Sequence, residues 1–203
     1  MEYQDLSSFR VPLSFRGESK VKVQIWWIVQ DTLFRWSPQV LFGWRTWLLR
    51  LFGAKIGKHV NIRSTVRVTY PWKLSIGNHV WIGDDCVLYN LGQITIGNNV
   101  ALAHKVYLNT GGHDYQKTTF DIFSKPVVLE DQCWLTNDVY IAPGVTIGKG
   151  TIIAARSSVF TSMPEGKICV GTPAKPIKDR IPAPLSLSST IASHSAVKKS
   201  DVQ

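Results

Sequence analysis

The chain has 203 residues, of which 44% are hydrophobic and 18% charged, and its formal net charge is +9. Its size is typical of one globular domain with an appendage, and its lysines and arginines are spread out rather than clustered, so no nucleic-acid partner is expected. The three cysteines lack CxxC spacing and the first ten residues are polar, so we expect neither a disulfide framework nor a secretory signal, and a cytoplasmic location.

Residues 1–55 form a tryptophan-rich segment, in which residues 20–52 hold five of the eight tryptophans. Charged residues interrupt its apolar runs, which are shorter than the ~20 residues of a membrane-spanning helix. The pattern predicts two helices that are broken at Ser37 and Pro38. Their apolar faces need a partner. They cap the open end of the domain that follows, contact another subunit, or dock peripherally at the inner face of the membrane.

The centre of the chain, residues 129–159, has an aliphatic residue at every sixth position. Helical stripes recur near every 3.6 residues and strand stripes at every second residue, so neither explains this period. A spacing of six predicts short strands separated by turns, each strand sending one side chain into a shared interior. The residues of this ladder are Leu129, Leu135, Ile141, Ile147, Ile153 and Val159.

The same spacing begins at Ile56 and restarts at Ile76 and Ile96, with glycine and asparagine at the turns. Three six-residue units per repeat indicate a coil with three flat sides, whose stacked turns make parallel sheets. We assign residues 56–180 to this domain. Cys86 and Cys133 fall on inward positions, so we expect them to be core residues rather than reactive thiols.

The ladder is interrupted by an insertion at residues 109–126, which begins N-T-G-G-H-D. A repeat domain that is interrupted once often carries a functional site there. The insertion places His113 after two glycines, although a lone histidine in a loop is by itself more often a solvated residue than a base. Beyond residue 180 no repeat continues and serine dominates, so we expect residues 181–203, with His194, to be a disordered tail.

These features resemble the bacterial transferase hexapeptide-repeat acyltransferases. The six-residue repeats, the N-T-G-G-H-D segment and the G-T-P-A-K segment at residues 171–175 carry the resemblance, which covers about residues 56–180. The segment around His113 is similar to that of the galactoside and maltose acetyltransferases, except that Asp114 stands where those enzymes commonly have proline. That departure, and the entry into the repeats, resemble the colanic acid and exopolysaccharide O-acetyltransferases.

The resemblance implies an all-β fold, a single-stranded left-handed parallel β-helix with an N-terminal helical segment and a C-terminal extension. The left hand would be an exception to the usual crossover rule. It also implies an acetyl-CoA-dependent O-acetyltransferase that acts directly on a sugar hydroxyl in capsule, exopolysaccharide or lipopolysaccharide assembly. Members of the family are typically homotrimers and need no metal.

The resemblance also assigns catalytic residues. His113 would be the general base, because a neutral imidazole accepts a proton near pH 7. Asp114 would orient the imidazole, with Asp31 as the alternative carboxylate. Asn90 would bind the acceptor through its amide, and its alternative role is to hold a corner of the coil.

The acetyl-CoA site is expected near the last coils. Asn137 and Ala155, at equivalent places one coil apart, match residues that line the pantetheine groove. Lys175 and Lys178 match the basic residues that meet the CoA phosphates, and their alternative role is that of a solvated basic face.

Two other functions are weighed against this one. His59 and His79 are equivalent residues one coil apart, which suggests a zinc enzyme like the γ-class carbonic anhydrases. However, the spacing of His104 and His113 does not match the three-histidine pattern of those enzymes. The second alternative is a non-catalytic binding or scaffold protein built on the same repeats.

Overall fold

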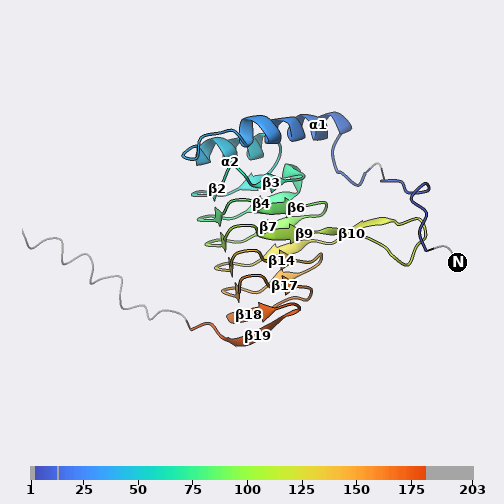
Figure 1. Ribbon diagram of the computed structural model, residues 1–203. Coiled ribbons are helices and arrows are strands. Elements are labelled where there is room, and N and C mark those ends of the chain that lie inside the picture. The colour runs from blue at the N-terminus through green and yellow to red at the C-terminus, as the bar shows by residue number, and fades with distance from the viewer. Residues whose placement is uncertain (1–2, 13, 182–203) are drawn as a thin grey trace, which may run out of the picture.

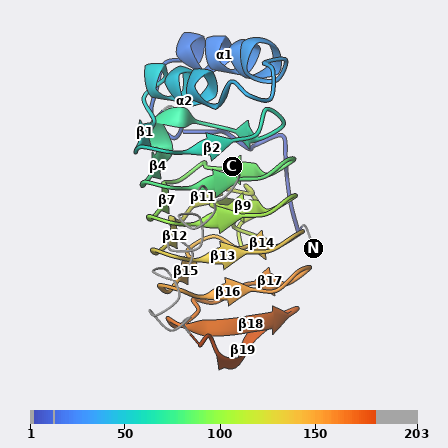
Figure 2. The ribbon, with the colours of Figure 1, turned by 90° about the vertical axis from the view of Figure 1, so that its left-hand side faces the viewer.

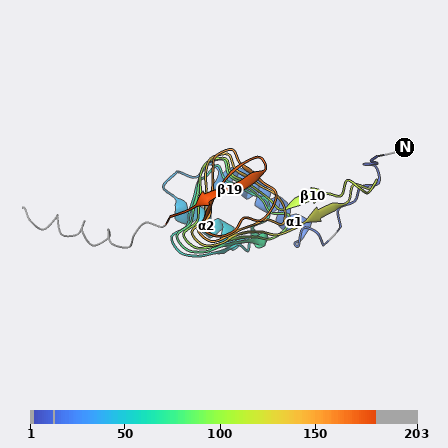
Figure 3. The ribbon, with the colours of Figure 1, turned by 90° about the horizontal axis from the view of Figure 1, so that it is seen from below.

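The computed structural model describes residues 3–12 and 14–181, and most of them form a parallel β-solenoid (Figure 1). Each coil contributes one strand to each of three sheets, so that the outline seen along the solenoid is three-sided (Figure 3). The predicted fold class, a mostly-β solenoid of six-residue repeats, is confirmed. Sheet A contains β1 (Lys55–Ile56), β4 (Leu74–Ile76), β7 (Ile94–Ile96), β12 (Val127–Leu129) and β15 (Thr146–Ile147).

The other two sheets follow the same order along the solenoid (Figure 2). Sheet B contains β2 (Asn61–Ile62), β5 (Trp81–Ile82), β8 (Ala101–Leu102), β13 (Trp134–Leu135), β16 (Ile152–Ile153), β18 (Lys167–Gly171) and β19 (Ala174–Asp179). Sheet C contains β3 (Arg67–Val68), β6 (Val87–Tyr89), β9 (Tyr107–Asn109), β14 (Tyr140–Ile141) and β17 (Ser158–Val159).

The interior is the aliphatic ladder that the spacing predicts. Ile82 pairs in register with Leu102, and Leu102 with Leu135, and all three side chains are buried. Cys86 and Cys133 are buried too, as expected. Burial raises the pKa of the Cys86 thiol to about 12 and that of Cys133 to about 11, so both stay protonated at neutral pH and serve as core residues.

The corners of the coil need a left-handed backbone residue. His59 and His79 have φ values of 56° and 57° at the corner between sheets A and B, the A/B corner. Asp85 and Asp138 occupy the matching place at the corner between sheets B and C, the B/C corner, with φ values of 58° and 61°. Histidine, asparagine and aspartate tolerate this conformation better than most other residues, which accounts for their recurrence.

A helical cap covers the first coil (Figures 1 and 2). It consists of α1 (Lys20–Val29), a π-helical turn η1 (Gln30–Phe34) and α2 (Phe42–Leu51). Trp26 Nε1 donates to the Val68 carbonyl over 2.8 Å, and Gln30 Oε1 accepts from the Val68 amide over 2.6 Å. The cap thus satisfies backbone groups at the exposed end of the solenoid, as end units must.

The two helices are separated at the predicted break, and Arg45 of α2 holds the connection in place. Its side chain is buried, and Nε donates to the carbonyl of Ile62 over 2.6 Å. The other guanidinium nitrogens donate to Ser37 Oγ and to the carbonyls of Pro38 and Gln39. Among the described helices, none has the length and hydropathy of a membrane span.

The C-terminal end of the solenoid is closed by a β-hairpin and not by helices. The last two strands, β18 and β19, form an antiparallel pair, and β18 continues sheet B from β16. The predicted tail and His194 lie outside the described residues, apart from residue 181.

Candidate active site

The insertion at residues 109–126 is a β-hairpin that projects from the solenoid (Figure 1). Its strands are β10 (Gly111–His113) and β11 (Ile122–Ser124), and His113 pairs with Ile122. The hairpin leaves the corner between sheets C and A, the C/A corner, because β9 precedes it and β12 follows it. His113 therefore lies in a hydrogen-bonded β-hairpin and not in an irregular loop.

The root of the hairpin is fixed by buried contacts. Thr110 is fully buried, and its hydroxyl accepts from the Gly92 amide over 2.8 Å. A Cβ atom at Gly111 would lie 2.5 Å from Leu91 Cδ1, which is closer than real Cβ contacts come. Glycine is needed here because β10 passes directly over the Leu91 side chain.

The imidazole of His113 is held by Phe120 on the connection between the two strands. His113 Nδ1 lies 2.8 Å from the carbonyl oxygen of Phe120, and the two rings stack with centroids 4.0 Å apart and planes 7° from parallel. A carbonyl oxygen only accepts, so Nδ1 must carry the proton, and in the neutral ring Nε2 keeps the free lone pair. This tautomer is the one that a general base acting through Nε2 requires.

Phe120 adopts an unusual backbone conformation to make these contacts. Its φ is 53°, in the left-handed region that bulky residues seldom occupy. Strained conformations of this kind gather at functional sites, where the surrounding structure imposes them. The sequence reasoning missed Phe120, because nothing in the order of residues shows that its carbonyl turns toward His113.

The N-terminal segment reaches the same site from the other end of the chain (Figure 1). The Asp5 amide donates to the Thr118 carbonyl over 2.8 Å, and the Phe9 ring meets the His113 ring edge-on with centroids 5.3 Å apart. Phe9 was also missed by the sequence reasoning. It is about a hundred residues from His113, and no local pattern joins them.

A hollow of about 450 Å³ opens beside the imidazole. It contains an ion pair in which Lys117 Nζ lies 2.9 Å from Asp121 Oδ2. The hydrogen bond and charge of Asp121 raise the pKa of Lys117, and hydrogen bonds from Lys117 and Thr119 lower that of Asp121. The hollow therefore presents aromatic and charged groups beside the imidazole of His113. Its lining residues are His113, Asp114, Tyr115, Lys117, Asp121, Ile122 and Phe123.

The two expected orienting carboxylates are engaged elsewhere. Asp114 lines the hollow, but its Oδ1 accepts from the Gln116 amide over 3.0 Å within the turn. Asp31 lies on the cap, where it pairs with Arg67 at 3.0 Å. The Phe120 carbonyl occupies the position next to Nδ1 that the sequence reasoning gave to a carboxylate.

Asn90 is fully buried and does not face the hollow. Its Oδ1 accepts from the Tyr70 amide over 2.9 Å, and its Nδ2 donates to the Tyr70 carbonyl over 2.6 Å. Both ends of the amide are therefore used inside the fold. Asn90 therefore holds a corner of the coil, which was the alternative role, and neither end of its amide is free to contact an acceptor.

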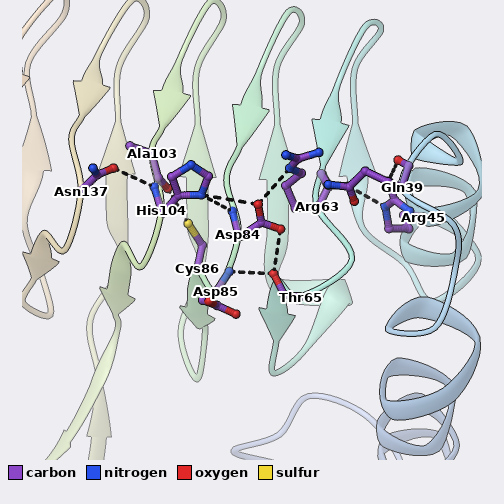
Figure 4. A network of polar contacts seen from close by, with 11 residues as sticks. Gln39, Arg45, Arg63, Thr65, Asp84, Asp85, Cys86, Ala103, His104 and Asn137 are labelled. Atoms are coloured by element: carbon purple, nitrogen blue, oxygen red, sulfur yellow. Dashed lines mark hydrogen bonds and ion pairs between the residues drawn. The ribbon is translucent and has the colours of Figure 1, made fainter.

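The residues expected at the donor site lie elsewhere, along the B/C corner. Asn137 Oδ1 accepts from the His104 amide over 3.2 Å, and His104 Nδ1 accepts from the Asp84 amide over 3.0 Å (Figure 4). The Asp84 carboxylate in turn pairs with Arg63 at 3.1 Å, so the network runs from the first coil toward the later coils. Ala155 stands exposed one coil beyond Asn137.

The two lysines of the C-terminal segment lie on β19, at the end of sheet B. Lys175 pairs with Val170 and Lys178 with Ile168, and both lysines are exposed. They share sheet B with the strands that lead to Asn137 and Ala155. Lys175 is nearer the end of β18 that leads to the B/C corner, whereas Lys178 is nearer the start of that strand.

One chain thus carries two separate groups of candidate residues. The hairpin with His113 leaves the C/A corner, whereas Asn137 and Ala155 follow the B strands at the B/C corner. Each strand of sheet C runs from the B/C corner to the C/A corner, so the two groups lie at opposite ends of these strands.

The histidines considered for a metal site lie at corners. The rings of His59 and His79 stack with centroids 4.8 Å apart, and His104 lies in the network described above. Across residues 3–12 and 14–181, no group of three histidine, cysteine or acidic side chains is placed to hold a metal ion.

Comparisons with known proteins point in one direction. The chain is 56% identical over 178 residues, 88% of its length and 98% of the relative's, to the putative colanic acid biosynthesis acetyltransferase WcaF of Escherichia coli K12. It superposes on the crystal structure of a maltose O-acetyltransferase from Clostridium difficile 630 with a TM-score of 0.72 and 28% identity, covering 78% of this chain and 87% of that one.

A further superposition is with a hexapeptide-repeat acetyltransferase of Vibrio cholerae, crystallised with acetyl coenzyme A. Its TM-score is 0.73 at 23% identity, and it covers 80% of this chain and 89% of that one. At that identity the likeness shows the fold alone. No family model matches the chain.

Proposed function

The chain belongs to the hexapeptide-repeat acetyltransferases, and from that premise we propose that it acetylates a sugar hydroxyl in the assembly of an exopolysaccharide, with acetyl-CoA as donor. The name of the 56% identical relative, a putative colanic acid biosynthesis acetyltransferase, supports both the pathway and the transfer of an acetyl group. The hollow beside His113 has the aromatic and charged groups that could bind a saccharide acceptor.

The observation that carries this proposal is the 2.8 Å contact between His113 Nδ1 and the Phe120 carbonyl oxygen, because it selects the tautomer of His113. With Nδ1 donating to the Phe120 carbonyl, Nε2 can take the proton of the acceptor hydroxyl while its oxygen attacks the acetyl carbonyl. As the carbon–sulfur bond breaks, the same proton passes from Nε2 to the departing thiolate. The products are the acetyl ester and free CoA, and no acyl-enzyme forms.

The donor would lie along the B/C corner. Ala155 adds only a methyl group there, so a pantetheine arm could pass close to the backbone, with the Asn137 amide beside it. Lys175 and Lys178 would meet the phosphates, because exposed ammonium groups pair readily with them.

The separation of the two corners supports a homotrimer. A second copy whose C/A corner meets the B/C corner of the first would bring His113 to the donor, and repeating that contact closes a ring. Sheet C, between these corners, carries aromatic side chains on its outer face. Tyr107 and Tyr140 lie there with ring centroids 5.9 Å apart.

The test is release of free thiol from acetyl-CoA in the presence of candidate sugars, with the acetylated product identified by its mass. His113→Ala should lower turnover by about 10²- to 10⁴-fold, the usual contribution of a general base, while the thermal unfolding midpoint stays unchanged. His79→Asn is the control, because it removes a corner histidine at a left-handed position that asparagine tolerates. Wild-type turnover in His113→Ala would contradict the proposal, and absence of thiol release with every donor and sugar would favour the scaffold alternative.

A further inference from the structure

The cap has a second face that the solenoid does not cover. Val23, Trp26, Phe34, Leu48 and Leu49 are buried against the solenoid side of the cap. The opposite side, here named the outer cap face, consists of large apolar residues with 37–80% of their surface exposed. These are Val21, Ile25, Ile28, Leu33, Trp36, Val40, Leu41, Trp44, Trp47 and Leu51.

We propose that the outer cap face is a docking surface for an anionic phospholipid membrane. This proposal goes beyond the transferase function and does not depend on it. The occupant is a lipid headgroup layer, and the arguments for it are the spacing of the apolar residues, the charge of the cap and the orientation of the helices.

The apolar residues follow the helical period on both helices. Val21, Ile25 and Ile28 make one stripe on α1, and Trp44, Trp47 and Leu51 make another on α2. Isolated exposed apolar residues are ordinary, but two stripes on adjacent helices form a patch of the kind that marks an interaction surface.

The cap carries more basic than acidic side chains. Its acidic groups are engaged, since Glu18 pairs with Lys22 at 2.6 Å and Asp31 with Arg67 at 3.0 Å. Lys20 and Arg35 are exposed, and neither makes an ion pair within the part of the chain that the structure describes. Anionic headgroups complement such cations, whereas a second copy of the same face would bring like charges together.

The helices are placed to lie in a membrane interface. They run across the end of the solenoid rather than along its axis, so the outer cap face looks away from the body of the protein (Figures 1 and 2). α1 and α2 have ten residues each, about half the length of a spanning helix, which suits insertion parallel to the surface. Tryptophan prefers this depth because its ring is apolar and its N–H is polar.

The experiment measures binding of the full chain to phosphatidylglycerol vesicles, with phosphatidylcholine vesicles as reference, by co-sedimentation. We expect binding to phosphatidylglycerol that weakens as salt is raised. Lys20→Glu with Arg35→Glu should weaken it by at least about 25-fold, from about fivefold for each cation removed.

Trp36→Ser with Trp47→Ser tests the apolar part and should reduce binding at least tenfold. Trp81→Ser is the matched control, because Trp81 on sheet B is 52% exposed, close to the 50% of Trp47, but lies outside the cap. Unfolding midpoints check that each variant is folded. Thiol release with a water-soluble sugar and no vesicles should be unchanged in the cap variants, so this proposal and the transferase proposal can fail separately.

Three outcomes would overturn the proposal. They are wild-type protein that stays unbound with phosphatidylglycerol, equal binding to the two lipids, and binding that is unaffected in the cap variants. A change of molecular mass in Trp36→Ser with Trp47→Ser, without vesicle binding by the wild type, would instead assign the face to another copy of the chain.

Discussion

At the residue scale, the chemistry of the site depends on how one backbone carbonyl meets one imidazole. The Phe120 carbonyl selects the tautomer of His113, and the Phe120 ring covers a face of the same imidazole at 4.0 Å. Phe120 touches the base rather than the proposed substrates, so it is a positioning residue. Its left-handed backbone at φ 53° is the conformational cost of these two contacts.

Replacing Phe120 by asparagine should separate the contribution of the ring from that of the carbonyl. Asparagine tolerates the left-handed backbone, so the carbonyl should stay on Nδ1 while the stacking is lost. Because aromatic pairs contribute about 0.5–1.5 kcal/mol, we expect kcat to fall roughly 2- to 10-fold with KM for acetyl-CoA unchanged. Steady-state kinetics measure both constants.

Phe120→Tyr is the conservative counterpart and should keep kcat near that of the wild type, since the ring is retained. An equal loss of kcat in both variants would show that stacking is not what holds the imidazole. A rise in KM for acetyl-CoA alone would place Phe120 in donor binding instead.

At the element scale, the hairpin of β10 and β11 carries the base, and its root determines where the base stands. The Lys125 amide donates to the Thr110 carbonyl over 2.8 Å, and the Gly111 amide donates to Asn109 Oδ1 over 2.9 Å. These bonds join the two ends of the hairpin to each other, and the buried Thr110 hydroxyl attaches them to the preceding coil by accepting from the Gly92 amide and donating to the Tyr89 carbonyl. A displacement at the root is therefore expected to move His113.

Gly111→Ala should cause such a displacement. The new Cβ would lie 2.5 Å from Leu91 Cδ1 and 3.2 Å from Leu91 Cβ, so either the strand or the buried leucine must shift. We expect a loss of about 1–3 kcal/mol in the free energy of unfolding, as for overpacking, and a fall in kcat. Denaturant unfolding and thiol release measure the two effects.

Gly43→Ala on α2 is the control, because its Cβ would meet nothing within 4 Å and alanine stabilises a helix by about 0.5–1 kcal/mol. Combining Gly111→Ala with Leu91→Ala removes the 2.5 Å contact with Cδ1 and leaves only the 3.2 Å contact with the Cβ of residue 91, so kcat should recover in large part even though stability stays low. If kcat does not recover in that double variant, the clash is not the cause of the loss.

At the scale of the whole molecule, the proposed base and the proposed donor groove of one chain lie at opposite ends of the strands of sheet C. The base extends from the C/A corner, and the proposed donor groove follows the B/C corner. A site shared between copies makes a prediction that a site within one chain does not. In a shared site, a copy that lacks the base still has an intact donor groove, and a copy whose groove is blocked still has an intact base.

Ala155→Trp should block the proposed pantetheine groove with its indole, and His113→Ala removes the proposed base. Mixing the two variants should therefore restore activity, although each variant alone has lost nearly all turnover. After the two are refolded together, random assembly gives about one quarter of interfaces an intact base and an intact groove, so about a quarter of wild-type turnover is expected. Thiol release by the mixture, compared with each variant refolded alone, is the measurement. No recovery, with trimeric mass confirmed by light scattering, would place the whole site in one chain.

Much of the architecture could be predicted from the sequence, because a period of six can be read without knowing the fold. Leu102 and Leu135 point inward because each occupies the inward position of a six-residue repeat. The same spacing predicts that Cys86 and Cys133 are buried. The insertion was visible as a break in that period. The family resemblance then drew attention to His113.

The tertiary structure alone decided which groups meet across the chain. Asn90 looked equally suited to an acceptor and to a corner, and only the position of the Tyr70 backbone, 20 residues away, shows that its amide is already used. Phe9 and Phe120 reach His113 through chain folding that no periodicity encodes. A repeat determines which side chains point inward, because that depends on spacing along one strand. Contacts at the corners and in the hairpin depend on which segments lie side by side, and spacing does not determine that.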